Sequence, residues 1–218
     1  MGYEVPLNGI ILSGQPIGDC DRRLVILTKE RGKISCFARG ARKQGSPLLG
    51  NTRSFAFGTF YIYEGRSSYS LHSTQISNYF EDIIKDYDAT LYACYFAEIA
   101  DYYGREGIEA KDAINLLYMA FCALTDNRLD KEIIKCTYEI RAVVLSGECP
   151  PPEEILPDIM KDDSYKKLFM YIATCPLERL FKYTLGNESA ERLKIFSEKL
   201  IRCSVDKKLK SKEMLPKQ

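Results

Sequence analysis

The chain has 218 residues, of which 45% are hydrophobic and 28% are charged, and its formal net charge at pH 7 is +1. This composition is typical of a soluble globular protein with a hydrophobic core, and the length allows one large or two small domains. No apolar run approaches the roughly 18 residues of a membrane span, and no secretory signal is visible. We therefore expect no membrane partner and no export.

The charges are distributed unevenly along the chain. Residues 1–78 contain 10 Lys and Arg against 5 Asp and Glu, residues 79–198 contain 14 against 23, and residues 199–218 contain 7 against 2. A basic beginning and a basic end therefore flank an acidic middle. This asymmetry indicates a polyanionic partner for the two ends, and the simpler alternative is that it only maintains solubility.

The first 78 residues have the patterns of β-strands. Alternating or apolar runs predict five strands, at 9–13, 24–28, 34–38, 54–63 and 69–74. A turn at 30–33 joins the second and third runs into a hairpin, and Gly58 indicates a bulge or a sharp bend in the fourth. Five strands with a long connection between the third and the fourth predict a closed or nearly closed barrel, of which the OB-fold is the commonest type.

From about residue 79 the apolar residues repeat with a helical period. Helices are expected at 91–102, 113–124, 133–145 and 158–174, with a helical turn at 177–181 and a last helix through Cys203. Gly104 and Gly147 are expected to end the first and the third helix, and Asn187 or Ser189 to cap the last one. The fold class is thus α+β, with a barrel domain at 1–78 followed by an all-helical domain at 79–218.

Motifs for catalysis and for metal binding are missing. Among eight cysteines no two form a CxxC pair, and one histidine cannot complete a Cys₂His₂ set, so neither zinc nor another cofactor is expected. Without a secretory signal, we expect reduced thiols and a cytoplasmic protein. P-loop, GxGxxG and GxSxG motifs do not occur, and His72 lies on the polar side of its strand. We therefore expect no enzymatic activity.

The loop after the third strand has the clearest functional pattern. Residues 37–46 contain three cations and two glycines. Such a loop can bring guanidinium, ammonium and backbone N–H groups to phosphates, although an ordinary solvated turn can have the same composition. Basic residues just before the second and the third predicted strand add to the loop's charge. The candidate nucleic-acid-binding residues are Arg39, Arg42, Lys43, Arg22, Arg23 and Lys33.

The predicted barrel contains further cations and many aromatic residues besides these six candidates. Arg53 and Arg66 add charge, and single-strand binders combine a basic groove with aromatic side chains on which bases stack. Aromatic residues in strands are nevertheless core residues more often than stacking platforms. We interpret one alternating face as mainly core, formed by Phe55, Phe57, Thr59, Tyr61 and Tyr63. The cations would contact the sugar-phosphate backbone and so ignore sequence.

An ordered set of short motifs resembles a known family. They are GIIL at 9–12, DCD at 19–21, LVILT at 24–28, ERGKI at 30–34 and ARGARK at 38–43, followed by Ser46. Two later segments, PLERLF at 176–181 and DKKLKS at 206–211, continue the pattern. Together they resemble the RecO family of bacterial DNA repair and recombination mediators.

The resemblance implies a fold and a set of activities. It implies an N-terminal OB-fold, a helical C-terminal domain, binding to single- and double-stranded DNA, annealing of complementary strands, and help in loading RecA onto coated single strands. The implied partners are RecR and the acidic C-terminal tail of the single-strand-binding protein, with a location at the nucleoid. Cations of the helical domain that could receive that tail are Arg128, Lys131 and Lys135.

Many members of the family carry a four-cysteine zinc site after the long helix. Residues 145–150 match the sequence that precedes this insertion, but the paired cysteines that should follow are absent. We therefore expect no zinc, and a truncated or lost finger lobe near 149–175.

Two other hypotheses remain open at this point. The first is a protein-interaction adaptor whose OB-fold does not bind DNA by itself. The second is an RNA-binding OB-fold protein, because a groove that contacts only phosphates does not distinguish RNA from DNA by the 2′-hydroxyl. Whether the purified chain shifts a labelled oligonucleotide separates the adaptor from the other two.

Overall fold

The computed structural model describes residues 3–65 and 68–216. The chain divides into two compact units, one formed by Met1–Lys85 and Ala100–Ile114, the other by Asp86–Ile99 and Asn115–Gln218. Compared with the boundary predicted between residues 78 and 79, the first unit also takes in a second, separate stretch of chain. We call the two units the barrel unit and the helical unit and describe each by itself.

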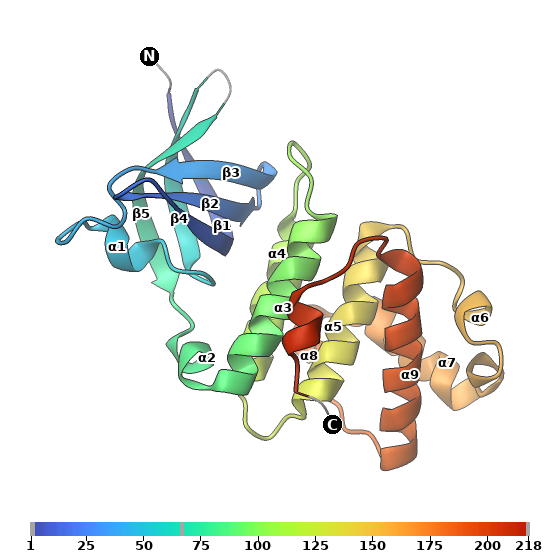
Figure 1. The fold of residues 1–218 in the computed structure, drawn as a ribbon. Coiled ribbons are helices and arrows are strands. Elements are labelled where there is room, and N and C mark those ends of the chain that lie inside the picture. The colour runs from blue at the N-terminus through green and yellow to red at the C-terminus, as the bar shows by residue number, and fades with distance from the viewer. Residues whose placement is uncertain (1–2, 66–67, 217–218) are drawn as a thin grey trace. The chain divides into compact units, whose positions relative to one another are not determined.

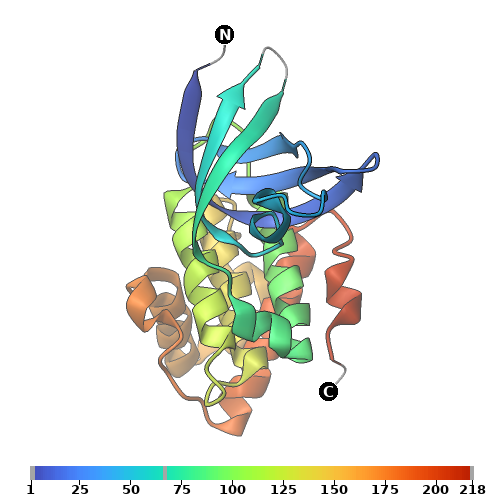
Figure 2. The same cartoon turned by 90° about the vertical axis from the view of Figure 1, so that its left-hand side faces the viewer.

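The barrel unit contains a closed five-stranded barrel (Figures 1 and 2). Its strands are β1 (Glu4–Ile17), β2 (Asp21–Thr28), β3 (Gly32–Ala38), β4 (Phe57–Glu64) and β5 (Tyr69–Asn78). Their order around the barrel is β1-β2-β3-β5-β4, in which only the β3–β5 pair is parallel. A short helix, α1 (Leu48–Asn51), lies in the long connection between β3 and β4. This arrangement is an OB-fold, which confirms the predicted α+β class with an N-terminal barrel followed by helices.

Strand β1 is longer than its sequence pattern indicated, because it closes the barrel. It pairs with β4 from Glu4 to Ile10 and with β2 from Gly9 to Ile17, and a register shift between Ile11 and Ser13 bends it between its two partners. Its end is exposed and contains Gly14 and Pro16, so no apolar run marks the full strand. A bulge of this kind is a common way to turn a strand around a barrel corner.

The core of the barrel corrects one prediction from the sequence. Phe60 and Ile62 of β4 point inward and are 0% and 1% exposed, whereas Tyr63 is 40% exposed and lies with Tyr61 on the outer face. The interpretation of the Phe55–Tyr63 face as core was therefore wrong for the strand, although Phe55 itself is buried just before it. Apolar residues occupy both faces of β4, so alternation could not identify the inner one. The register shift at Gly58 agrees with the predicted bulge.

The second stretch of the barrel unit, residues 100–114, hydrogen-bonds with the β2–β3 turn. The backbone N–H of Lys33 donates to Arg105 O at 3.1 Å, and that of Ala110 donates to Lys29 O at 3.1 Å. Gly32 has φ +65°, and a Cβ there would lie 2.0 Å from Arg105 O. Only glycine therefore allows this approach, since any larger residue would collide with the backbone.

Helices make up the rest of the chain. They are α2 (Glu81–Lys85), α3 (Tyr87–Tyr103), α4 (Lys111–Leu124), α5 (Lys131–Ser146), α6 (Pro152–Ile155), α7 (Asp163–Thr174), α8 (Leu177–Leu180) and α9 (Asn187–Ser204), with 3₁₀ turns η1 (Ile159–Lys161) and η2 (Ser211–Met214). All the predicted helices are present, and Gly147 ends α5 with φ 76°. The predicted caps of α9 are wrong, because its N-cap is Gly186 and Asn187 is already helical. In the described part of the chain no helix is long and apolar enough to cross a membrane.

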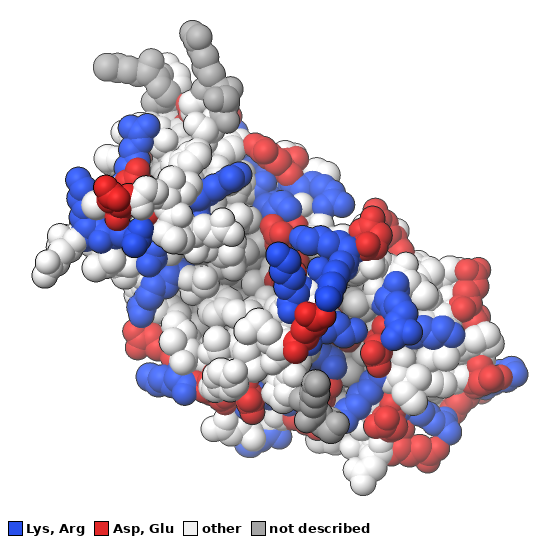
Figure 3. Space-filling view, in the orientation of Figure 1, with Lys and Arg blue, Asp and Glu red and all other residues white. Residues whose placement is uncertain are grey.

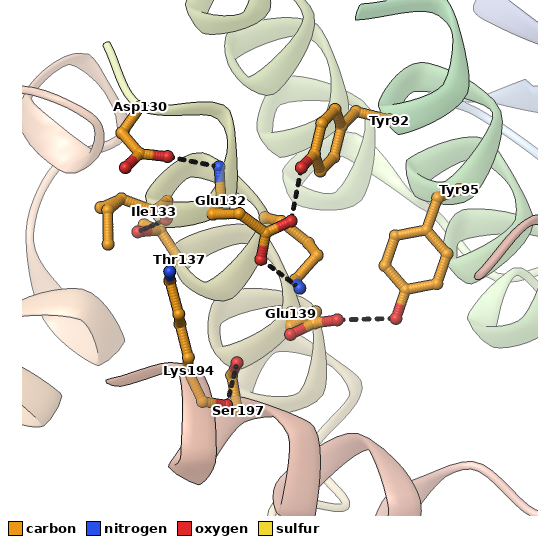
Figure 4. A network of polar contacts seen from close by, with 10 residues as sticks. Tyr92, Tyr95, Asp130, Glu132, Ile133, Thr137, Glu139, Lys194 and Ser197 are labelled. Atoms are coloured by element: carbon orange, nitrogen blue, oxygen red, sulfur yellow. Dashed lines mark hydrogen bonds and ion pairs between the residues drawn. The ribbon is translucent and has the colours of Figure 1, made fainter. Parts of the chain in front are cut away.

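Several buried polar side chains of the helical unit are paired with one another (Figure 4). The Tyr92 hydroxyl donates to Glu132, the Lys135 ammonium lies 2.6 Å from Glu132 Oε2, and the Tyr95 hydroxyl donates to Glu139 Oε1 at 2.6 Å. Glu139 is 1% exposed, and burial raises its pKa. These contacts join α3 to α5 within the unit.

The cysteines are free thiols and do not gather. All eight lie in the residues that the structure describes, and burial raises the pKa of Cys36 to about 12. No group of three or more His, Cys, Asp or Glu that could hold a metal occurs within residues 3–65 and 68–216. Residues 149–175 contain α6, η1 and α7. The loss of a zinc-binding lobe there stays a prediction.

Candidate nucleic-acid interface

The loop between β3 and α1 is fixed against the turn between β1 and β2. We call residues 39–46 the basic loop. Gly40, at φ +65°, donates its backbone N–H to Asp21 Oδ1 at 2.7 Å, and the N–H of Arg42 donates to Cys20 O at 2.8 Å. The loop therefore has a defined backbone conformation, with Ala41 buried in the barrel core and the side chains of Arg39, Arg42 and Lys43 exposed to solvent.

The three cations of the basic loop are exposed and uncompensated. The Arg42 guanidinium donates a hydrogen bond to the Gly18 carbonyl at 3.2 Å. A carbonyl carries no formal charge, so the positive charge of Arg42 is not neutralised. Within the described residues, neither Arg39 nor Lys43 has a side-chain hydrogen bond, and no carboxylate forms an ion pair with any of the three. A cation in solvent without a carboxylate partner retains its full attraction for a phosphate.

Arg22 and Arg23 lie on opposite faces of β2, because neighbouring strand residues alternate. Arg22 is half-buried at the end of the barrel, where its guanidinium donates to Thr52 O at 3.0 Å and to Thr52 Oγ1 at 3.1 Å. Arg23 faces outward, and its Nε donates to Ser35 Oγ at 2.8 Å. Arg23 is therefore the one of this pair that can contact a ligand, while Arg22 holds the segment after α1 to the barrel.

The structure does not bring Lys33 to the basic loop. Its ammonium lies 3.2 Å from Asp101 Oδ1 and donates to Asp101 O at 2.6 Å. It stands five residues before Ala38 on β3, which is about 17 Å along a strand. Arg53 also has a carboxylate nearby, Glu81 at 3.9 Å, and Arg66 lies outside the described residues.

A row of outward-facing residues crosses four neighbouring pairs of strands beside the loop. Successive partners in the registers are Gln15, Arg23, Phe37, Ser70 and Tyr63. We call this set the outer row. Sequence patterns did not reveal it, because the parallel β3–β5 pairing joins segments that no local signal connects.

Positive charge gathers at this part of the barrel unit (Figure 3). Lys and Arg side chains cluster at the left of the view, around the β3–α1 loop, with a few acidic atoms among them. Asp21, at the start of β2, accepts the hydrogen bond from the backbone N–H of Gly40. The site therefore offers charges and hydrogen-bond donors suited to an anion.

The three cations proposed for a protein tail are each paired with a carboxylate. Arg128 lies 2.6 Å from Asp126, Lys131 lies 3.0 Å from Asp86, and Lys135 lies 2.6 Å from Glu132. The hydrogen bond from Arg128 lowers the pKa of Asp126 to about 2. These cations are therefore neutralised locally and do not form one open positive pocket.

A groove near the end of the chain offers a different positive surface in the helical unit. Apolar residues and cations line a cavity of about 430 Å³, which we call the C-terminal groove: Ile201, Arg202, Val205, Lys207, Lys208, Leu209, Lys212 and Glu213. Lys208 pairs with Glu213 at 2.5 Å, whereas Lys207 and Lys212 have no ion pair in the described part of the chain. Glu98 holds this segment by accepting from the N–H of Lys210 and of Ser211, at 3.0 and 2.8 Å.

Comparison with known proteins supports the resemblance seen in the sequence. Residues 1–80 match the family model described as "Recombination protein O N terminal". Proteins named "DNA repair protein RecO" match over a longer stretch. The chain belongs to the RecO family. The match covers the whole barrel and explains why the motifs at 9–46 occur in their order.

The individual relatives are similar over part of their length. The protein of Clostridium acetobutylicum is 31% identical over 139 residues, which is 64% of this chain and 56% of the relative. That of Alkaliphilus metalliredigens is 30% identical over 146 residues, or 67% and 59%. That of Clostridium kluyveri is 28% identical over 138 residues, or 63% and 54%. The chain thus spans a little over half the length of the curated relatives that it matches.

Proposed function

We propose that the protein is a non-catalytic DNA repair factor that binds single- and double-stranded DNA and acts as a recombination mediator. The observation that carries this proposal is the basic loop. Its three cations, together with Arg23, project from an OB-fold without carboxylate partners in the described residues. The names of the relatives, DNA repair protein RecO, favour DNA as the polyanion.

The proposed mechanism is electrostatic. Cations of the basic loop bind phosphates of two strands and lower their mutual repulsion, so that complementary strands can pair. Contacts to the backbone carry no sequence information, which suits a protein that anneals arbitrary sequences. In the cell, we propose, the protein acts in the cytoplasm at the nucleoid, together with RecR, and assists the loading of RecA onto coated single strands.

Replacing the basic loop's cations tests the proposal. Arg39→Ala, Arg42→Ala and Lys43→Ala together should weaken DNA binding, because each cation that binds a phosphate releases counterions from the DNA. The slope of log K against log salt should flatten by about 0.7 to 0.9 for each phosphate that the loop no longer neutralises. Gel-shift titrations at several salt concentrations measure both quantities, and strand annealing should slow in parallel.

A matched variant controls for the removal of three charges. Lys161→Ala, Lys166→Ala and Lys167→Ala remove three exposed cations from the helical unit and should leave the slope unchanged. Unaltered affinity and slope in the loop variant would refute the proposal for this surface. A wild-type chain that shifts no oligonucleotide would favour the adaptor that binds only protein.

We further propose the C-terminal groove as the receptor for the acidic tail of the single-strand-binding protein. Its apolar lining residues, together with Lys207 and Lys212, which form no ion pair with a described residue, suit an acidic peptide. Lys207→Ala with Lys212→Ala should weaken binding of the tail peptide several-fold in fluorescence anisotropy, whereas Lys166→Ala with Lys167→Ala should not. Equal affinities would exclude this groove, while the loop variant tests DNA binding independently.

A further inference from the structure

We propose that Phe37 is a stacking site for one unpaired base, so that the outer row favours single-stranded over double-stranded nucleic acid. This inference rests on the proposed function, because the basic loop must first hold the backbone. It adds a preference that the cations alone cannot supply, since phosphates are present in both forms of DNA.

The first observation is that the Phe37 ring faces away from the core. The neighbours of Phe37 on β3, Cys36 and Ala38, are both 0% exposed and point inward, whereas Phe37 is 37% exposed. Burial in the barrel therefore does not explain an aromatic residue at this position. An exposed ring provides a flat apolar surface on which any base can stack.

The second observation concerns the residues beside Phe37. Its register partner on β2 is Arg23, and its partner on β5 is Ser70, which has a short side chain. Arg23 is held on the same outer face by Ser35 Oγ at 2.8 Å. The basic loop begins at Arg39, two residues later, or roughly 7 Å along an extended chain. A strand whose phosphates lie on these cations therefore passes the ring.

Tyr63 lies in the same outer row but in a different electrostatic setting. It is 40% exposed, and its ring lies 5.2 Å from that of His72. Its register partner is Glu4, whose carboxylate is 3.8 Å from His72 Nε2. Carboxylates repel a phosphate backbone, so the row divides into a favourable end at Phe37 and an unfavourable end at Tyr63.

Base pairing explains the expected selectivity. In a duplex both faces of each internal base are occupied by its neighbours, so a protein ring cannot stack on it without unstacking the helix. An unpaired base has no such cost. Stacking on an aromatic side chain raises affinity for a single strand by roughly 5- to 100-fold for each base.

The test compares single-strand and duplex binding for matched variants. Phe37→Ala should lower the affinity for oligo(dT) by roughly 5- to 100-fold and leave duplex affinity within about twofold. Phe37→Trp should retain the single-strand affinity, and Tyr63→Ala should change neither. The salt slope of Phe37→Ala should equal that of the wild type, since the substitution removes no charge.

A measurement on the unaltered protein covers the case in which Phe37→Ala does not fold. Oligonucleotides of abasic sites keep the phosphates and remove the bases, so the wild type should bind them with the lower affinity expected for Phe37→Ala on oligo(dT). Equal affinity for abasic strands and oligo(dT) would overturn the inference. So would a Phe37→Ala variant that weakens both forms equally or neither. Failure of the loop variant to weaken either form would instead refute the proposed function.

Discussion

Single residues decide how the helical unit responds to pH, and Glu139 is the clearest case. It is 1% exposed and accepts a hydrogen bond from Tyr95, and the other groups that interact with it are Lys135, Ser197 and Lys212. Loss of solvation is the largest influence and raises its pKa, against the hydrogen bond and the two lysines. At pH values between the ordinary carboxyl pKa and this raised pKa, the folded protein binds more protons at Glu139 than the unfolded chain does.

Glu139→Gln should make the stability of the protein less dependent on pH. Above the ordinary carboxyl pKa of about 4.3, the wild type binds more protons folded than unfolded, so its free energy of unfolding falls as pH rises to the raised pKa. The variant lacks this titration and should gain relative stability by at most about 1.4 kcal/mol per pH unit in that window. Urea denaturation between pH 5 and pH 8 measures it, and parallel curves would contradict the assignment.

At this scale the sequence predicted some of the site and missed the rest. The cations of the basic loop could be found, because a charged Gly-rich turn is a local pattern. That Arg22 and Arg23 would lie on opposite faces follows from strand alternation. The pairing of Lys33 with Asp101 could not be predicted, since 68 residues separate them and no periodicity relates them. The exposure of Phe37 required the barrel's closed topology.

Helices and strands could be predicted from the sequence where the pattern that identifies them lies within one segment of the chain. The long helices α3, α4, α5, α7 and α9 each follow a 3.6-residue period within one segment, so the sequence predicted them. The short helices α1, α2 and α6 were missed because four or five residues show no period. In β4 both faces are apolar, and only the pairing with β1 and β5 decides which one is inside.

The segment after α9 depends on one carboxylate of α3. Glu98 accepts two backbone N–H bonds and the Ser211 hydroxyl at the start of η2. Burial of Glu98 acts to raise its pKa, but these hydrogen bonds outweigh it and the pKa is lowered. The anchor is therefore complete above the ordinary carboxyl pKa and is lost as pH falls through the folded value.

Glu98→Ala should release residues 205–216 while leaving α9 folded. Hydrogen bonds to a charged group contribute about 1.5 to 3 kcal/mol, so trypsin should cleave at Lys207–Lys212 at least tenfold faster. Glu188→Ala serves as the control, because it removes an exposed glutamate whose partner is Arg192. If the two variants are cleaved equally slowly, Glu98 does not hold this segment.

On the scale of the whole molecule, net charge conceals the arrangement that matters. A value of +1 predicts no affinity for DNA, yet the barrel concentrates uncompensated cations in one loop, whereas the cations named in the acidic middle have partners. The distribution along the sequence showed this division. The division into two compact units did not follow from the charges, because residues 100–114, which include the end of α3 and the start of α4, belong with the barrel.

That second stretch has a consequence for synthesis of the protein. Strands β1 to β5 are synthesised first. The carbonyls of Lys29 and Arg31, however, accept hydrogen bonds from the N–H groups of Ala110 and Gly107, which are synthesised later. Residues 86–99, which belong to the other unit, emerge in between. Neither unit is encoded as one uninterrupted piece, so the maturation of one is tied to the translation of the other.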